Sequence, residues 1–151
     1  MRNVLFVCHG NICRSPMGEY ILKDLVRARG LEGRYHIESA AVSREELGNP
    51  VYPPARAELA KHGIDCRGHA ARQITPADYR LFDDILYMDG SNLRYLLRLF
   101  PGDPAGKLHR LTEFGPDRRD VEDPWYTGDF AGVYRQIAAA CGAYLDAREA
   151  V

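Results

Sequence analysis

The first strand of this chain is the feature that most restricts its fold. Residues 3–8 (NVLFVC) are apolar almost without a break, as in a strand that is buried on both faces. Residues 16–29 follow with apolar side chains at helical spacing. A buried strand that runs into a helix indicates a parallel sheet covered by helices. We expect Ser15 to be the N-cap of this helix and Pro16 its first residue.

The same alternation continues along the chain. The pattern predicts strands over residues 34–40, 83–88 and 107–111, and helices over 54–62, 90–99 and from Phe130 to Leu145. This order predicts one domain over residues 1–151, a three-layer α/β/α fold around a central four-stranded parallel sheet. Ligands of such sheets bind at the carboxyl ends of the strands, so the loop after the first strand is the favoured site.

Composition excludes several classes of partner. The 151 residues carry 20 Lys and Arg against 21 Asp and Glu, which favours neither nucleic acid nor a membrane surface. No apolar run reaches membrane-spanning length and we find no export signal, so we expect a cytoplasmic protein with reduced cysteines. The spacing of the four cysteines and of the histidines does not suit a metal site. The sequence does not fix the oligomeric state, and we expect a monomer.

The loop at residues 8–14 (CHGNICR) has the composition of a phosphate cradle. Gly10 and Asn11 tolerate left-handed backbone, which turns successive N–H groups inward as an anion nest. The helix that follows adds its dipole, and Arg14 can grip two phosphate oxygens. Cys8 at the floor of this field would be a thiolate nucleophile. A bare Cys-x5-Arg spacing also arises by chance, and a lone cysteine after a strand is commonly a core residue.

A nucleophile on phosphorus also needs a proton donor for the leaving oxygen. Residues 112–129 form a long stretch without periodicity, and such loops are uncommon unless they are functional or disordered. Within it, Pro124 restricts Asp123 to an extended conformation, and Trp125 and Tyr126 would form an apolar wall beside the carboxyl group. Asp-Pro is also a common turn dipeptide and the aromatics suit a core, so the residues alone leave both interpretations open.

The two segments together resemble the low-molecular-weight protein tyrosine phosphatase family. The family's V-C-x-G-N-I-C-R-S-P is matched from Val7 to Pro16, and its D-P-aromatic-Y from Asp123 to Tyr126. The segments ESAAVS (38–43), KHGI (61–64), ARQIT (71–75) and MDGSNL (88–93) follow in the family's order. The resemblance covers essentially the whole chain and implies hydrolysis of phosphotyrosine in proteins, with no metal or organic cofactor.

The resemblance also implies the catalytic roles. Cys8 would attack phosphorus to form a phosphocysteine intermediate, and Arg14 would bind the phosphate. Asp123 would protonate the leaving tyrosine oxygen and then activate a water molecule. The phosphate-binding loop would be formed by Cys8, His9, Gly10, Asn11, Ile12, Cys13 and Arg14. Ile12, Trp125 and Tyr126 would form the wall around the substrate ring.

Supporting roles follow from the same resemblance. Ser15 would donate a hydrogen bond to the Cys8 sulfur. Asn11 would hold the strained loop through a network with Ser39 and His69. Cys13 would form a reversible disulfide with the nucleophile under oxidation and so protect it.

Two features depart from the family pattern. His9 stands where apolar residues are frequent, and we expect its side chain to line the rim. Glu45 stands where the family often has an aromatic wall, and an acidic rim should disfavour acidic peptides.

Three alternatives remain on this scaffold. Arginine phosphatases of the family look to carry threonine in place of Ile12, which here favours phosphotyrosine through contact with the ring. Arsenate reductases share the loop but need two further cysteines close together in mid-chain and lack Asp-Pro. Here Cys66 lies in a predicted loop and Cys141 on the apolar face of the last helix. A phosphate-binding module without activity is disfavoured because nucleophile, arginine and acid are all present.

Overall fold

Four parallel strands form the centre of the protein, in a computed structural model that describes residues 1–150. They are β1 (Arg2–Cys8), β2 (Tyr35–Ala41), β3 (Asp84–Tyr87) and β4 (Leu108–Arg110), in the order β2-β1-β3-β4. At the carboxyl end of the sheet, Cys8 lies beside Ala41, and Val7 lies beside Tyr87. The predicted four-stranded parallel sheet is therefore confirmed.

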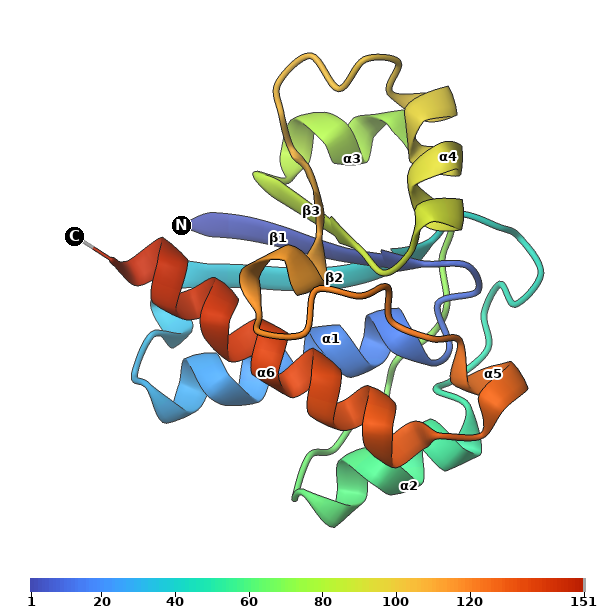
Figure 1. Cartoon of the computed structure of the whole chain (residues 1–151), viewed down its shortest axis with the longest axis vertical. Coiled ribbons are helices and arrows are strands. Elements are labelled where there is room, and N and C mark those ends of the chain that lie inside the picture. The colour runs from blue at the N-terminus through green and yellow to red at the C-terminus, as the bar shows by residue number, and fades with distance from the viewer. Residues whose placement is uncertain (151) are drawn as a thin grey trace.

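Helices cover both faces of this sheet (Figure 1). On one side lie α1 (Arg14–Ala28), α2 (Pro53–Lys61) and α6 (Phe130–Glu149), and on the other lie α3 (Pro76–Leu81) and α4 (Gly90–Leu99). Short turns complete the chain: α5 (Pro124–Thr127) and the 3-10 segments Glu32–Arg34 and Leu111–Phe114. No helix within the described residues is both long and apolar enough to cross a membrane.

Strand β1 explains why its apolar run has no alternation. Val4 and Phe6 point into the core beneath α1 and α6, whereas Leu5 and Val7 point into the core beneath α3 and α4. Helix α1 approaches the strand closely, because a Cβ on Gly18 would lie 2.5 Å from the Phe6 ring. This packing fixes both ends of the loop that joins β1 to α1.

The structure corrects three expectations about the helices. Helix α1 begins at Arg14 with Cys13 as N-cap, so Ser15 is not the cap and Pro16 is not the first helical residue. The Ser15 hydroxyl contacts Cys8 instead of capping the helix. The sequence pattern misses α3, which is too short to show periodicity and begins with a Thr75–Asp78 capping box. The stretch 112–129 also contains the short helix α5.

Asp84, the first residue of β3, connects helix α6 to the amino end of the sheet. Its carboxylate accepts hydrogen bonds from Tyr144 Oη at 2.5 Å, Arg148 Nε at 3.1 Å and Arg2 Nη1 at 3.0 Å. Burial acts to raise the pKa of Asp84, but the hydrogen bonds from Tyr144 and Arg148 outweigh it and lower the pKa. The ionised carboxylate therefore stabilises the fold.

Asp84→Asn should lower the free energy of unfolding by about 2 kcal/mol at pH 7, because it removes the negative charge that pairs with Arg2 and Arg148 and accepts from the buried Tyr144. The folded pKa lies below the unfolded value of about 3.9, so this stabilisation is complete above that value. It is lost as the pH falls through the folded pKa. Urea unfolding at a series of pH values should show the difference between parent and variant shrinking toward acid. A difference that stays constant with pH would contradict this role.

Candidate active site

The loop between β1 and α1 surrounds a cavity of about 150 Å³ at the carboxyl end of the sheet. Its lining comes from three separate segments of the chain: Cys8, His9, Gly10, Ile12, Cys13, Arg14, Glu45, Glu46, Asp123, Trp125 and Tyr126. The fold therefore brings Cys8, Arg14 and Asp123 to one cavity, although more than one hundred positions separate Asp123 from the loop.

Cys8 is the last residue of β1, and its sulfur meets two hydrogen-bonding groups. The backbone N–H of Asn11 donates to Sγ at 3.3 Å, and Ser15 Oγ lies 3.0 Å away. Ser15 Oγ already accepts a hydrogen bond from Asn11 Nδ2 at 2.8 Å, so its own hydrogen is free to point at the sulfur. Two donors directed at one sulfur suit a thiolate nucleophile.

Cys13 is the second sulfur of the cavity. Burial, followed by the neighbouring Cys8 and Asp123, raises the pKa of the Cys13 thiol to about 12. Cys13 is therefore a neutral thiol near neutral pH and a poor nucleophile.

Asn11 holds the loop in its bent conformation. Its backbone is left-handed, with φ of 60°, whereas Gly10 does not take a positive φ. The Asn11 side chain donates to Ser15 and to Ser39 Oγ, the latter at 2.9 Å, and accepts from the Arg72 N–H at 3.1 Å. Its orientation is fixed because both ends of the amide are bonded.

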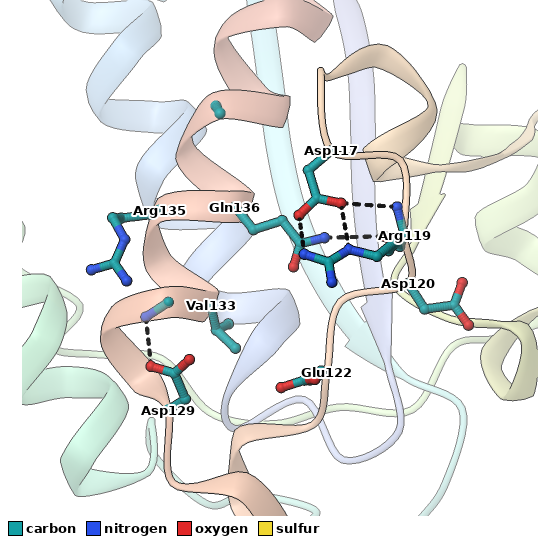
Figure 2. Close-up of a pocket in the computed structure, with 10 residues that line it drawn as sticks. Asp117, Arg119, Asp120, Glu122, Asp129, Val133, Arg135 and Gln136 are labelled. Atoms are coloured by element: carbon teal, nitrogen blue, oxygen red, sulfur yellow. Dashed lines mark hydrogen bonds and ion pairs between the residues drawn. The ribbon is translucent and has the colours of Figure 1, made fainter.

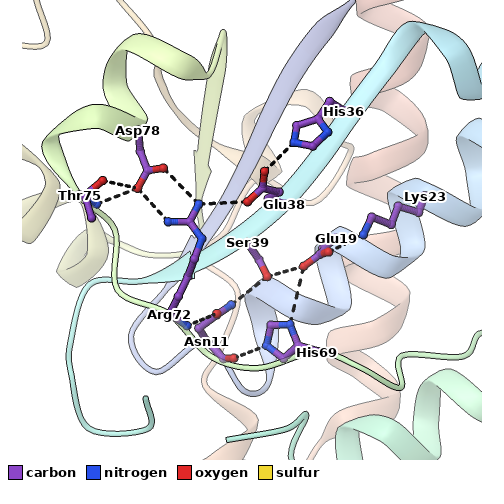
Figure 3. Close-up of polar contacts among 10 residues, drawn as sticks. All are labelled: Asn11, Glu19, Lys23, His36, Glu38, Ser39, His69, Arg72, Thr75 and Asp78. Carbon is purple, nitrogen blue, oxygen red and sulfur yellow. Dashed lines mark hydrogen bonds and ion pairs between the residues drawn. The ribbon is translucent and has the colours of Figure 1, made fainter. Parts of the chain in front are cut away.

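The network continues behind Asn11 (Figure 3). His69 Nε2 lies 2.8 Å from the Asn11 carbonyl oxygen, and Ser39 donates to the buried Glu19 at 2.5 Å. The structure thus brings Ser39 and His69 to Asn11. Glu19, which the sequence analysis does not single out, closes the network from α1.

Arg72 is a second residue that the sequence analysis misses. Its backbone meets Asn11, and its guanidinium binds both oxygens of Asp78, at 3.0 and 3.1 Å (Figure 3). Asp78 in turn caps α3 through the N–H of Thr75 at 2.7 Å. The contact joins residues 61 positions apart, so local patterns do not predict it. The segment ARQIT is the only sequence signal for this arrangement.

Arg14 is buried, with 2% of its surface exposed. Its Nη1 donates to Asp89 Oδ2 at 2.6 Å and to the Val121 carbonyl at 2.9 Å. The opposite edge, Nε and Nη2, makes no hydrogen bond to the part of the chain that the structure describes, and Nη2 lies 3.6 Å from Asp123 Oδ2. This edge has the fork geometry for two phosphate oxygens. Burial acts to lower the pKa of Arg14, but Cys8 and Asp89 outweigh it and raise the pKa, so the guanidinium stays charged.

Asp89 therefore orients the Arg14 guanidinium, a role that the sequence does not predict. Its other oxygen accepts from the Asn92 N–H at 2.9 Å and caps α4. An Asp before a helical pattern signals an N-cap, but nothing in the sequence shows that the second oxygen meets Arg14.

Asp123 lines the same cavity as the loop. It is extended (φ −80°, ψ 108°), as predicted for a residue before proline, and its Oδ1 accepts from the Trp125 N–H at 3.1 Å. Its Oδ2 lies 3.6 Å from Arg14 Nη2. The carboxyl group is thus held in one orientation at the cavity that contains the Cys8 sulfur.

The lining of the cavity combines apolar and charged side chains. Ile12 is buried, whereas Trp125 is 50% exposed and Tyr126 is 83% exposed. His9 Nε2 lies 3.0 Å from Glu45 Oε2, and both side chains are partly exposed where they line the cavity.

A larger hollow of about 610 Å³ lies between residues 117–122 and α6 (Figure 2). Its side chains are mostly charged, and Asp117 and Arg119 pair with each other at 2.9 Å. None of Cys8, Arg14 or Asp123 lines it. The catalytic candidates thus belong to the smaller cavity.

The two remaining cysteines lie away from the catalytic cavity. Cys141 is completely buried in α6 and packs in the core, as predicted. Cys66 is buried beside a separate hollow near α2. Neither lines the cavity that contains Cys8, so the described residues provide no thiol relay of the kind that an arsenate reductase needs.

A parallel α/β fold that places a cysteine, an arginine and a carboxylic acid at one cavity is typical of enzymes that transfer phosphoryl groups through a cysteine. The family model described as "Low molecular weight phosphotyrosine protein phosphatase" matches residues 3–150. The "Low molecular weight phosphotyrosine protein phosphatase 2" of Drosophila melanogaster is 42% identical over an alignment of 148 residues, which covers 95% of this chain and 90% of that protein. The chain therefore belongs to the low molecular weight phosphotyrosine protein phosphatase family.

Solved structures agree with this assignment. The crystal structure of YfkJ from Bacillus subtilis has a TM-score of 0.94 at 38% identity and covers 97% of this chain, with 94% of its own length matched. The crystal structure of DARP, drosophila arginine phosphatase, has a TM-score of 0.88 at 32% identity, with 99% of each chain covered. The enzyme is thus a phosphatase of the cysteine-dependent, low molecular weight class.

Proposed function

We propose that this enzyme hydrolyses phosphotyrosine in proteins through a phosphocysteine intermediate. The Cys8 thiolate attacks phosphorus, a sulfur–phosphorus bond forms, and the bond from phosphorus to the tyrosine oxygen breaks. Asp123 gives its proton to that oxygen and becomes a carboxylate. The carboxylate then takes a proton from water, whose oxygen attacks phosphorus and releases phosphate and the Cys8 thiolate.

This proposal rests on one observation: Cys8, Arg14 and Asp123 all line the same small cavity. Phosphoryl transfer depends mainly on positioning and on charge stabilisation. Arg14 supplies both, because Asp89 and Val121 hold one edge of its guanidinium and leave the other for phosphate oxygens. The Ser15 hydroxyl beside the sulfur stabilises the thiolate when it departs from phosphorus.

We assign supporting roles to the residues around the loop. Asn11, Ser39 and His69 hold the left-handed turn that directs the loop amides inward. Cys13, a neutral thiol in the same cavity, is the redox guard that pairs with Cys8 under oxidation. Ile12, Trp125 and Tyr126 form the wall against the tyrosine ring.

Hydrolysis of phosphoarginine is the second candidate. The relative described as an arginine phosphatase shares this fold, and the carboxylates of Glu45 and Glu46 at the rim suit a cationic guanidinium group. Ile12 favours the tyrosine ring, because it offers a methyl surface and no hydrogen-bonding group.

Two peptides that differ only in phosphotyrosine or phosphoarginine separate these candidates. We expect kcat/KM to be at least about tenfold higher for phosphotyrosine, since one good apolar contact in a pocket changes kcat/KM by about that factor. Ile12→Thr should lower this ratio, whereas Ala147→Glu, on the exposed side of α6, should not. Faster hydrolysis of phosphoarginine by the parent enzyme would overturn the assignment.

Partner and location follow from the same chemistry. We propose phosphotyrosine-containing proteins as substrates and a monomer as the working form. We also propose a cytoplasmic location, because the reaction uses Cys8 as a reduced thiolate and all four cysteines are free thiols in the structure.

A further inference from the structure

An apolar groove of about 600 Å³ lies beside the catalytic cavity. It is lined by Ile12, Glu46, Asn49, Pro50, Val51, Tyr52, Pro53, Arg56, Ala57, Ala60 and Trp125. Ile12, Glu46 and Trp125 also line the catalytic cavity. A polypeptide that places a side chain in the cavity therefore runs past the groove.

The groove is built on parts of the fold that are held firmly. Tyr52 donates its N–H to the Ile12 carbonyl at 2.8 Å, and its ring lies 4.6 Å from the Trp125 ring, centroid to centroid. Helix α2 is anchored in the core by Ala55 and Leu59, which are completely buried. Because these walls are fixed, the groove is largely formed before a ligand binds. Binding therefore costs the protein little conformational entropy.

Small side chains leave room in the groove. Ala57 and Ala60 face it from successive turns of α2, and Pro50 and Pro53 offer only methylene surface. The half-exposed Trp125 ring stands between groove and cavity. An aliphatic side chain placed here would exchange water for contact with proline, alanine and aromatic surface, which is favourable.

We propose that this groove binds an aliphatic side chain of the substrate protein, within a few residues of its phosphotyrosine. This specificity site rests on the proposed function, because phosphotyrosine in the cavity fixes the neighbouring chain at the groove. A short segment of substrate reaches both hollows, since they share Ile12 and Trp125. The enzyme then distinguishes phosphoproteins by the residues next to the phosphorylated tyrosine.

A scan of phosphotyrosine peptides tests the groove. The reference peptide carries alanine at the three positions on each side of phosphotyrosine, and six further peptides replace one alanine each by leucine. We expect kcat/KM to rise about tenfold for leucine at one position or at two adjacent ones, as for partial burial of a leucine side chain. The other positions should stay within about twofold of the reference.

Variants then place the effect in the structure. Ala57→Glu puts a carboxylate in the groove at an exposed helical position, and it should bring the leucine-to-alanine ratio down to about one. Each kcat/KM is divided by the same variant's value for p-nitrophenyl phosphate, which enters the catalytic cavity alone. Ala147→Glu adds the same charge to an exposed helical alanine of α6 and should keep the preference.

The kinetic results distinguish failure of the groove proposal from failure of the proposed function. Equal rates for all seven peptides, or a leucine preference that survives Ala57→Glu, would overturn the groove and leave the hydrolysis of phosphotyrosine in place. If the parent enzyme hydrolyses p-nitrophenyl phosphate but none of the seven peptides, the proposed function fails and the groove fails with it.

Discussion

Cys8→Ser should abolish turnover, with a loss on the order of 10⁵–10⁶ in kcat for both phosphotyrosine peptides and p-nitrophenyl phosphate, as for removal of a nucleophile elsewhere. The serine hydroxyl keeps nearly the same shape but is a far weaker nucleophile than a thiolate. The loop around it should stay intact, because its turn depends on Asn11, Ser15 and Ser39. Steady-state kinetics measures the loss, and binding of inorganic phosphate to the variant shows that the cradle still forms.

Cys66→Ser is the matched control for this change. It makes the same substitution at a buried cysteine outside the catalytic cavity, and turnover should remain within a few-fold of the parent. A Cys8→Ser enzyme that turns over at a comparable rate would remove Cys8 as the nucleophile.

Asp123→Ala should lower kcat/KM, which reports the step that forms phosphocysteine, by about 10²–10⁴ for phosphotyrosine peptides, the usual contribution of a positioned acid. The loss should be much smaller for p-nitrophenyl phosphate, because p-nitrophenolate leaves readily without a proton. This dependence on the leaving group separates loss of an acid from general damage to the site. Damage to the cavity would lower both rates by the same factor.

Asp117→Ala serves as the control for Asp123. Asp117 lies in the preceding loop, pairs with Arg119 and lines the larger hollow, away from Cys8. Its loss should change neither rate by more than about twofold. Equal losses for the peptide and for p-nitrophenyl phosphate in Asp123→Ala would assign the proton donor elsewhere.

Much of the fold could be predicted from local patterns. The run of buried residues in β1 predicts a parallel sheet with helices on both faces, and the structure confirms it. Helix α3 could not be predicted from periodicity, because six residues make fewer than two turns. The prediction that Ser15 is the N-cap of α1 is wrong, because the general preference of serine for caps takes no account of the Cys8 sulfur, which lies 3.0 Å from Ser15 Oγ.

Some residues of the candidate site could also be predicted from local sequence patterns, whereas others could not. Cys8 and Arg14 share one short loop, and Asp123 is marked by the proline that follows it, so all three stand out in the sequence. Asp89 and Arg72 do not, because their contacts with Arg14 and Asn11 join distant segments. Asp89 looks like an ordinary helix cap, and only the structure shows that its second oxygen holds the arginine.

These hidden residues show how the fold keeps the loop ready for phosphate. Asp89 ties Arg14 to the start of α4, and Arg72 with Asp78 ties Asn11 to the start of α3. Both helices lie on the face of the sheet opposite α1 (Figure 1). The loop is thus held from both layers of helices, which fixes its donors before phosphate arrives.

The most direct test is the mass of the covalent intermediate. Asp123→Ala is mixed with p-nitrophenyl phosphate, quenched within the first turnovers, digested and analysed by mass spectrometry. The slow hydrolysis step of this variant should leave one phosphoryl group on the peptide that contains Cys8, bonded to that sulfur, and Cys8→Ser should show none. A phosphoryl group on any other residue, or first turnovers with no covalent phosphate, would contradict catalysis through phosphocysteine at Cys8.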